Sequence, residues 1–412
     1  MSRLERAAAG TLTVVLLALM TIEPAPAAVG VAVRPSLPSY KGLNYGVPLT
    51  QDGDWVGTAW LRPSAWPAVR PAIAADLVFI EQHHLGRVVR LFIALDQLMD
   101  WDRSLGFRGF RAAELAHLDE TLDLFDAHGI RAVAVLYDQE VISSPGNFRF
   151  AALDGRHAAM RDGYLRATEG FLARYRQRAT VAAWDLFNEA YASLGTGGGR
   201  PRPPAPDPVS PGYQTSTVHS FLHDLYLAAR RAAPDAPLTV SDATLYFQPQ
   251  PDLSLYDDIL DFYDVHVYDD HPRLEALSHT LDKPFIIGEA GAAVEGDAFA
   301  DQRIEPGVVE SILEQGRRAG ALAVLVHSIA SQNVFPATRD RLTPTGEVLA
   351  SFDAAQASRS EWPIVLRALS LVHFVTTIGG IWRWRRTPVA EIAAGREGLW
   401  KRPSGSAWAA GP

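Results

Sequence analysis

The sequence contains no cysteine among its 412 residues. A chain without cysteine forms no disulfide bond, has no thiol nucleophile and offers no thiolate ligand to a metal ion. Positive charge is also in short supply, because 38 Lys and Arg stand against 47 Asp and Glu, for a formal net charge of -9. This balance provides no basic surface for nucleic acid, so we predict that the protein does not bind it.

Apolar runs long enough to suggest a membrane segment are scarce, and the two candidates lie near the ends of the chain. At the start, Arg3 and Arg6 precede an apolar run from Ala7 to Met20, and small residues follow up to Ala28. This order is typical of a secretory signal peptide, so we expect residues 1–28 to be cleaved and the protein to be secreted or extracytoplasmic. An uncleaved anchor is the alternative, which the shortness of the run disfavours.

The second candidate, residues 363–387, is mostly apolar and closes with alternating Trp and Arg. Tryptophan and arginine beside an apolar span are typical of a membrane interface, so a C-terminal tether of an exported domain is one interpretation. One Arg, one His and a Gly-Gly pair interrupt the run, and a helix packed on the domain surface is an equal alternative. We expect residues 388–412 to be a disordered tail and the protein to be a monomer.

Between these ends, residues 40–356 alternate strand-like and helix-like segments. Short apolar runs that predict strands occupy residues 40–46, 87–95, 131–137, 181–189, 237–242, 261–268, 284–291 and 321–328. Periodic segments that predict helices cover about 66–84, 111–128, 158–177, 218–232, 273–280, 308–319 and 345–355. Residues 243–260 are the hardest to assign. Eight strands alternating with helices predict an α/β fold, a (β/α)8 TIM barrel.

An open doubly wound sheet is the alternative architecture. It would need a glycine-rich phosphate turn, but the segment "GTGGGR", Gly195 to Arg200, fails the dinucleotide pattern at its last position and follows no strand directly. This segment instead opens a Pro- and Gly-rich connection that runs to Gly212. Connections of this length are usually functional lids or insertions, and a barrel would place this one over its active site.

The predicted strands end in an unusual number of polar residues. In barrels of this type the active site lies at the C-terminal ends of the strands. The polar residues at or near those ends are Arg90, Tyr137, Asp138, Asn188, Glu189, His266, Tyr268, Glu289 and His327. Glu189 and Glu289, on the fourth and seventh strands, would face each other across the mouth of the barrel.

Two facing carboxylic acids are the machinery of glycoside hydrolysis. One donates a proton to the departing oxygen, and the other attacks the anomeric carbon or activates water, depending on how far apart the two groups lie. Arg90, if adjacent to Glu289, would favour the anion that a nucleophile needs, while Glu189 would have to hold a proton. Asn188 is placed to bind a sugar hydroxyl. This chemistry needs no metal ion and no organic cofactor, and we expect neither.

Four motifs on the predicted strands, "VVRLFI", "WDLFNEAY", "DVHVY" and "FIIGEAG", resemble the cellulase-like retaining glycoside hydrolases, the clan A, family 5-like enzymes that include cellulases and β-mannanases. The resemblance covers about Tyr40 to Ala355. It implies Glu189 as acid/base and Glu289 as nucleophile, with Arg90, His266 and Tyr268 organising the two glutamates. It also implies an enzyme that cleaves a β-glycosidic bond in an oligo- or polysaccharide with retention.

The chain departs from this family's pattern at two positions. Members commonly carry a histidine near the end of strand three, where this chain reads "LYDQE", so Tyr137 or Asp138 must fill that space. They also commonly place a sugar-stacking tryptophan at the end of strand eight, where His327 stands. We therefore expect sugar recognition to differ from the usual pattern. A catalytically inactive carbohydrate-binding barrel of the cell envelope is the alternative function, because a fold alone does not determine activity.

Overall fold

The computed structural model describes residues 33–46, 60–102, 104, 106–138, 158–191, 215–248, 250–292, 303–327, 334–336 and 338–352. The expected signal peptide, the connection from Gly195 to Gly212, the apolar segment 363–387 and the tail 388–412 lie outside these residues and remain predictions. Within the described part of the chain, no helix has the length and apolar character needed to cross a bilayer.

Eight parallel strands close into a barrel, which confirms the predicted (β/α)8 fold. In spatial order around the barrel they are β1 (Lys41–Tyr45), β10 (Val324–Val326), β9 (Phe285–Gly291), β8 (Tyr263–Tyr268), β7 (Leu238–Asp242), β6 (Val181–Asn188), β5 (Arg131–Val135) and β2 (Val88–Phe92). Each predicted strand corresponds to one of them, and the structure trims the predicted ends by a few residues. Strand identity is therefore set by the apolar, β-branched runs, because both faces of a barrel strand are buried.

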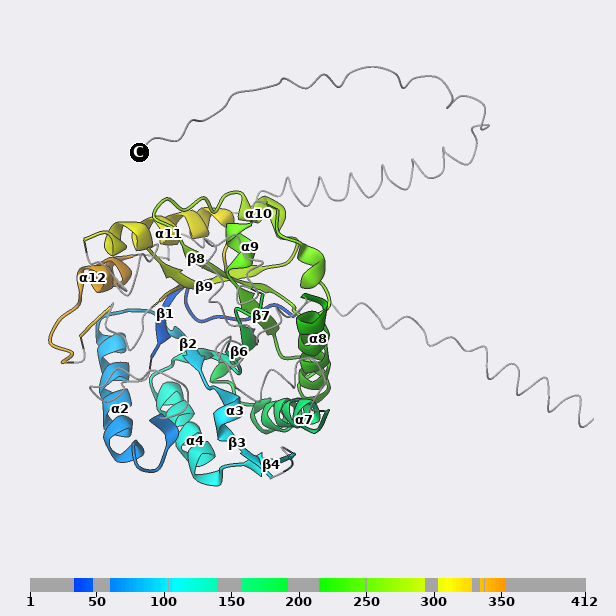
Figure 1. The fold of residues 1–412 in the computed structure, drawn as a ribbon. Helices are drawn as coiled ribbons and strands as arrows, with labels where there is room; N and C mark the ends of the chain where they lie inside the picture. Colours follow the sequence, from blue (N-terminus) through cyan, green and yellow to red (C-terminus); the bar gives the residue numbers. More distant parts are fainter. Residues whose placement is uncertain are drawn as a thin grey trace, which may run out of the picture. The chain divides into compact units, whose positions relative to one another are not determined.

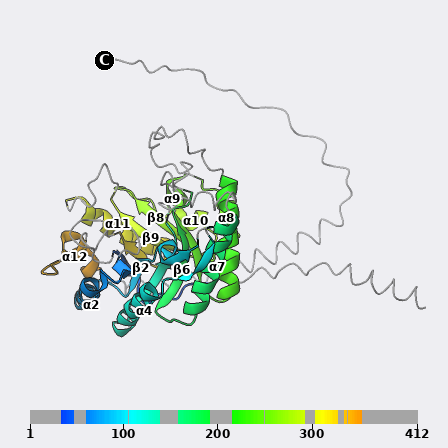
Figure 2. The same ribbon diagram turned by 60° about the horizontal axis from the view of Figure 1, so that its bottom comes forward.

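The helices lie outside the ring of strands in both views of the fold (Figure 1 and Figure 2). They are α2 (Trp66–Gln82), α4 (Ala112–Ala127), α7 (Ala158–Tyr175), α8 (Thr215–Ala232), α10 (Leu277–Thr280), α11 (Glu305–Ala319) and α12 (Pro344–Ser351). In α8 the apolar residues Val218, Leu222 and Leu225 recur at helical spacing and are fully buried, which fixes the face that packs on the barrel. Helix α11 ends at Gly320, which has the left-handed conformation that glycine adopts most readily.

Several short elements were not predicted from the sequence. Between β2 and α4 the chain forms α3 (Leu95–Leu98) and an antiparallel hairpin of β3 (Met99–Trp101) and β4 (Phe107–Phe110). The ring of Trp101 lies so close to α7 that a β-carbon on Gly163 would be 2.6 Å from it. Trp101 is thus a packing residue of the hairpin. The unassigned stretch before β8 contains α9 (Thr244–Phe247) and the 3-10 turn η3 (Leu253–Leu255).

The lower part of the barrel is filled by an apolar layer of seven residues, which lie on or directly before six of the strands. We call it the lower layer; it consists of Val88, Val133, Ala183, Phe262, Ile286, Ala323 and Leu325, all at most 1% exposed. Two residues further along their strands, Arg90, Asp185 and Asp264 are also fully buried. Because side chains two apart on a strand share a face, these charged residues stand directly above the apolar ones inside the barrel.

Bulges in β6 and β9 change which side chains face the interior. Along β9 the pairing with β8 runs from Val265↔Ile287 to His266↔Glu289, so Gly288 is an extra residue in its strand. Strict alternation from the inward-facing Ile286 would turn Glu289 outward, whereas the bulge turns it inward. Strand β6 shows the same kind of shift against β7, between Asp185 and Asn188. Both strands that carry a candidate catalytic glutamate are therefore irregular just before it.

Candidate active site

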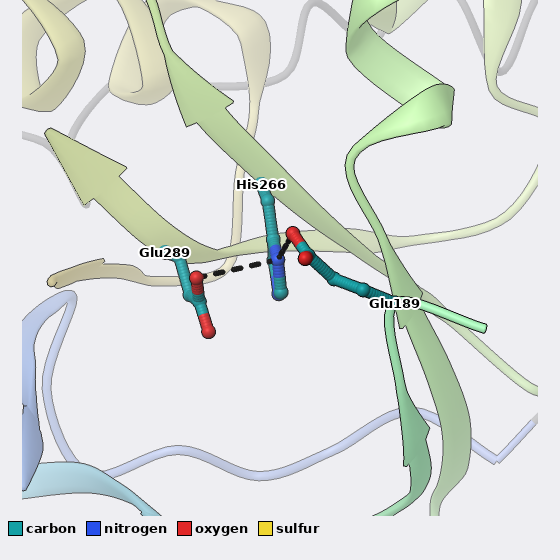
Figure 3. Close-up of side chains that lie close together, drawn as sticks. All are labelled: Glu189, His266 and Glu289. Atoms are coloured by element: carbon teal, nitrogen blue, oxygen red, sulfur yellow. Dashed lines mark hydrogen bonds and ion pairs between the residues drawn. The ribbon is translucent and has the colours of Figure 1, made fainter. Parts of the chain in front are cut away.

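The structure brings Glu189 and Glu289 together at one end of the barrel, with His266 between them (Figure 3). Nδ1 of His266 lies 2.7 Å from Oε1 of Glu189 and 3.4 Å from Oε2 of Glu289. One oxygen of each glutamate and one ring nitrogen of His266 all lie within 4.8 Å of one another. The two acids, a hundred positions apart in the sequence, thus share one small space at the ends of β6 and β9.

Arg90 is the centre of the buried network beneath the two glutamates. Its guanidinium donates to Oε1 of Glu289 at 2.5 Å and to Oδ2 of Asp185 at 2.7 Å. It also donates to Asn188, Ser241 and Asn44, at 2.7, 2.9 and 3.2 Å. Burial lowers the pKa of Arg90, but the nearby anions Glu289, Asp185 and Asp264 outweigh it and raise the pKa overall. Arg90 is therefore a permanent cation against Glu289.

Glu289 is held as an anion. Burial raises its pKa, but the cations of His266 and Arg90 lower it more, to about 2 overall. The hydroxyl of Tyr268 donates to Oε2 of Glu289 at 2.5 Å. Burial first, and then the charge of Glu289, raise the pKa of Tyr268 well above its usual value, so this hydroxyl keeps its proton. Glu289 thus has the ionisation state of a nucleophile, and one oxygen is fixed by Arg90 and the other by Tyr268.

Glu189 occupies an unusual backbone position. It follows the last residue of β6 with a φ of 52°, in the left-handed region that non-glycine residues rarely adopt. Its amide donates to the carbonyl of Ser241 at 2.9 Å, which holds the chain in this turn. Residues in such conformations cluster at functional sites, where the surrounding structure determines the geometry. The turn leaves the side chain of Glu189 15% exposed, against 7% for Glu289, so Glu189 is the more accessible acid.

His266 is buried between charges of both signs. Burial lowers its pKa, but Glu289 and the hydrogen bond to Glu189 raise it, to about 9 overall. Among the described residues, Glu189, His266 and Glu289 form the one group whose spacing could hold a metal ion. The contacts within this trio are a 2.7 Å hydrogen bond between Nδ1 of His266 and Oε1 of Glu189 and a 3.4 Å ion pair between the same nitrogen and Oε2 of Glu289. The raised pKa of His266 makes both contacts charge-assisted.

Asn188 and Asp138 adjoin the network, whereas Tyr137 points elsewhere. Asn188 accepts from Arg90 through Oδ1, and its Nδ2 donates to Oδ2 of Asp138 at 3.0 Å. The hydroxyl of Tyr137 lies 3.0 Å from Oγ1 of Thr168 on α7. Of the two residues expected to fill the place of the family's histidine, Asp138 thus reaches the site residues, and Tyr137 packs between the barrel and α7.

His327 follows β10, and its ring stands edge-on to that of Tyr268, with centroids 5.4 Å apart at 82°. Its backbone amide donates to the carbonyl of Ala290 at 2.9 Å. Burial, the largest effect, lowers the pKa of His327 below its usual value, and the cations His266 and Arg90 lower it further against the opposing charge of Glu289. A neutral imidazole therefore stands beside Tyr268, at the position where the resembling family places a tryptophan.

Four further residues belong to the buried network although they stand at no predicted strand end: Asn44, Asp185, Ser241 and Asp264. Each lies on a predicted strand and is at most 3% exposed. The available signal was a polar residue at an inward-facing strand position below the rim. Using that signal requires the register of each strand, which the bulges in β6 and β9 conceal.

No family model matches this sequence, and no curated protein matches it. Solved structures do. A β-mannanase from the blue mussel Mytilus edulis shares 16% identity at a TM-score of 0.55, over 80% of this chain and 98% of that one. A GH5_18 variant from Streptomyces cattleya in complex with Manβ1-4GlcNAc shares 14% identity at a TM-score of 0.54, over 79% and 82% of the two chains.

A glycoside hydrolase family 5 enzyme from Prevotella bryantii shares 14% identity at a TM-score of 0.51, over 77% of this chain and 97% of that one. At identities this low, the structural similarity establishes a shared fold and nothing more. These three solved structures are glycoside hydrolases, the class that the four strand motifs indicated, and what the likeness shows for this chain is the barrel fold.

Proposed function

We propose that the protein is a retaining glycoside hydrolase that cleaves a β-glycosidic bond in an oligo- or polysaccharide by double displacement. The observation that carries this proposal is the approach of one Glu189 oxygen and one Glu289 oxygen to within 4.8 Å. Retaining enzymes hold their two carboxyl groups about 5–5.5 Å apart, and inverting enzymes about 6.5–9.5 Å, to make room for a water molecule. The short separation favours direct attack by a carboxylate.

Glu289 is the nucleophile of this mechanism, since Arg90, His266 and Tyr268 stabilise its anion. It attacks the anomeric carbon while Glu189 donates a proton to the departing oxygen. In the second step Glu189 takes a proton from water, and the resulting hydroxide releases the sugar from Glu289. The His266 contact of 2.7 Å supports the anion of Glu189 that exists between these steps.

The neighbouring structures suggest which sugar to test first. Neighbouring structures are named as β-mannanases, and one holds Manβ1-4GlcNAc, so β-linked mannose is the first sugar to test. His327, whose ring contacts that of Tyr268, gives this site a small imidazole ring where the resembling family has the broad surface of a tryptophan. We infer that recognition in the catalytic subsite relies on hydrogen bonds more than on ring stacking.

The test is a panel of aryl β-glycosides and soluble β-mannans and β-glucans, with the anomer of the first product followed by proton NMR. Release of a β-anomer supports the proposal, and release of an α-anomer contradicts the retaining mechanism. Binding of a polysaccharide without release favours the alternative, an inactive carbohydrate-binding barrel. The Glu289→Ala variant, assayed on the same panel, excludes a contaminating hydrolase.

We also propose that the protein acts outside the cytoplasm, on the basis of the signal-like residues 1–28. N-terminal sequencing of the protein recovered from its host tests cleavage near Ala28. The segment 363–387 remains a candidate tether. Loss of detergent dependence on truncation after about Ser360 would support it, and extraction of the full chain without detergent would end it.

A further inference from the structure

One buried spot beside the site contains four polar side-chain atoms that have no hydrogen-bond partner among the described residues. They are Nε of Arg90, both carboxylate oxygens of Asp264 and Nε2 of His266. Asp264 lies between the other two, with Oδ2 at 3.6 Å from Nε of Arg90 and Oδ1 at 3.9 Å from Nε2 of His266. A fully buried carboxylate without hydrogen bonds is costly, so its retention needs a reason.

The fold makes a specific space for this carboxylate. A β-carbon added to Gly288 would lie 1.8 Å from Oδ1 of Asp264, so only glycine fits at the bulge of β9. The carbonyl of the same Gly288 accepts from Nδ2 of Asn44 at 2.7 Å, which fixes the bulge in place. The bulge that turns Glu289 inward thus also leaves room for Asp264 beneath His266.

The imidazole of His266 has an acid on each side. Its Nδ1 faces Glu189 and Glu289, while its Nε2 faces Asp264. In the proposed reaction the negative charge is on Glu289 before the first step and on Glu189 after it. A cation that contacts both glutamates stabilises both states, provided that it does not lose its proton in either.

We propose that Asp264 is a positioning residue that keeps His266 protonated, so that one imidazolium serves both glutamates as the negative charge passes between them. This inference rests on the proposed function, which it deepens. Asp264 touches no reacting atom. It acts through the far nitrogen of the ring, where its charge attracts the proton on Nε2.

The other charges around Asp264 set the pH range in which it acts. It faces Arg90 on β2, Asp185 on β6, His266 on β8 and Glu289 on β9. Burial raises the pKa of Asp264 to about 7, against the opposing attraction of Arg90. Asp264 is therefore ionised in the alkaline range, in which His266 would otherwise release its proton, and neutral in the acidic range.

The test is Asp264→Asn, which keeps the shape and removes the charge. We expect the alkaline limb of the pH profile of kcat/KM to move to lower pH by about one unit or more, since an anion near 4 Å shifts a buried pKa by at least that much. The acidic limb should stay, because Asp264 is neutral there. A uniform loss of rate with both limbs in place would overturn the proposal.

A second readout does not depend on activity. In ¹⁵N-histidine NMR, with His266→Gln used to assign the signal, His266 should titrate at lower pH in Asp264→Asn than in the wild type. An unchanged titration overturns the inference even if the protein hydrolyses sugars, and a shifted one supports it even if no substrate is found. If the variant fails to fold, the wild-type titration decides: a His266 that loses its proton at or below pH 6.5 contradicts the proposal.

Discussion

The lower layer of the barrel and the network around Arg90 are built from the same strands, two residues apart. Val88 and Arg90 share an inward face of β2, and Ala183 and Asp185 share one of β6. Both members of each pair are at most 1% exposed. Below, apolar side chains contact one another; above, one arginine neutralises several carboxylates. The two regions are equally buried and differ in chemistry alone.

This difference in chemistry implies that the two regions contribute differently to the stability of the barrel. Apolar burial contributes about 25 cal/mol per Å² removed from water. A buried ion network gains far less, because desolvation of its charges offsets most of their attraction. The lower layer therefore stabilises the barrel. The barrel in turn holds Arg90, Glu289 and His266 close together, although each charged group would be better solvated in water. Substitutions should separate the two contributions.

The largest expected effect is that of Glu289→Ala on catalysis. Because the proposed covalent intermediate forms on the carboxylate of Glu289, kcat should fall by at least about 10⁴-fold. The protein should still fold, because Arg90 keeps Asp185 as its partner, but with a lower melting temperature, because Arg90 and His266 lose a buried anion. Steady-state kinetics and thermal unfolding measure the two. Glu310→Ala, at an exposed position of α11, is the matched control and should retain full activity. A Glu289→Ala protein with the wild-type rate would refute the assignment.

The strands and the residues at their ends could be predicted from the sequence, whereas the buried network beneath the two glutamates could not. Runs such as "VVRLF" and "FIIGEAG" identify strands because both faces are buried, and Asn188, Glu189 and Glu289 stand out as charged or amide groups at strand ends. The bulge at Gly288 and the left-handed Glu189 depend on cross-strand pairing, which no local pattern contains. For the same reason the sequence does not distinguish Asp264 from the other residues of its strand. The orientation of the Tyr137 side chain is set by its hydrogen bond to Thr168 on α7, which the sequence of the strand does not show.

The next largest effect is expected in the lower layer, from Ile286→Ala. Removing most of a fully buried side chain should lower the free energy of unfolding by about 2–5 kcal/mol, through lost burial and the cavity left behind. Activity per folded molecule should remain within a few-fold, because the change lies below the charged network. Urea unfolding and assays on the folded fraction test this. Val78→Ala, on the exposed face of α2, should shift stability by less than about 0.5 kcal/mol.

Because of the charged network, the free energy of unfolding should decrease as the pH rises into the alkaline range. The folded pKa of His266 is raised to about 9, above its ordinary 6.5. Its contribution is therefore fully present below pH 6.5 and is lost as pH rises through about 9, at up to about 1.4 kcal/mol per pH unit. Denaturant midpoints between pH 6 and 10 should fall more steeply for the wild type than for His266→Gln. Parallel curves would show that the folded protein does not favour the imidazolium.

The smallest effect is expected for an exposed ion pair whose N–O distance is close to that of the buried pair of Arg90 and Asp185. Nε of Arg70 on α2 lies 2.9 Å from Oε2 of Glu120 on α4, yet these side chains are 50% and 45% exposed. Water screens such a pair, so Arg70→Ala should change the free energy of unfolding by less than about 1 kcal/mol, and by less still at high salt. Urea unfolding at low and high ionic strength measures this. A larger, salt-insensitive loss would mean that the stem of Arg70 packs α2 on α4, and that its charge contributes little.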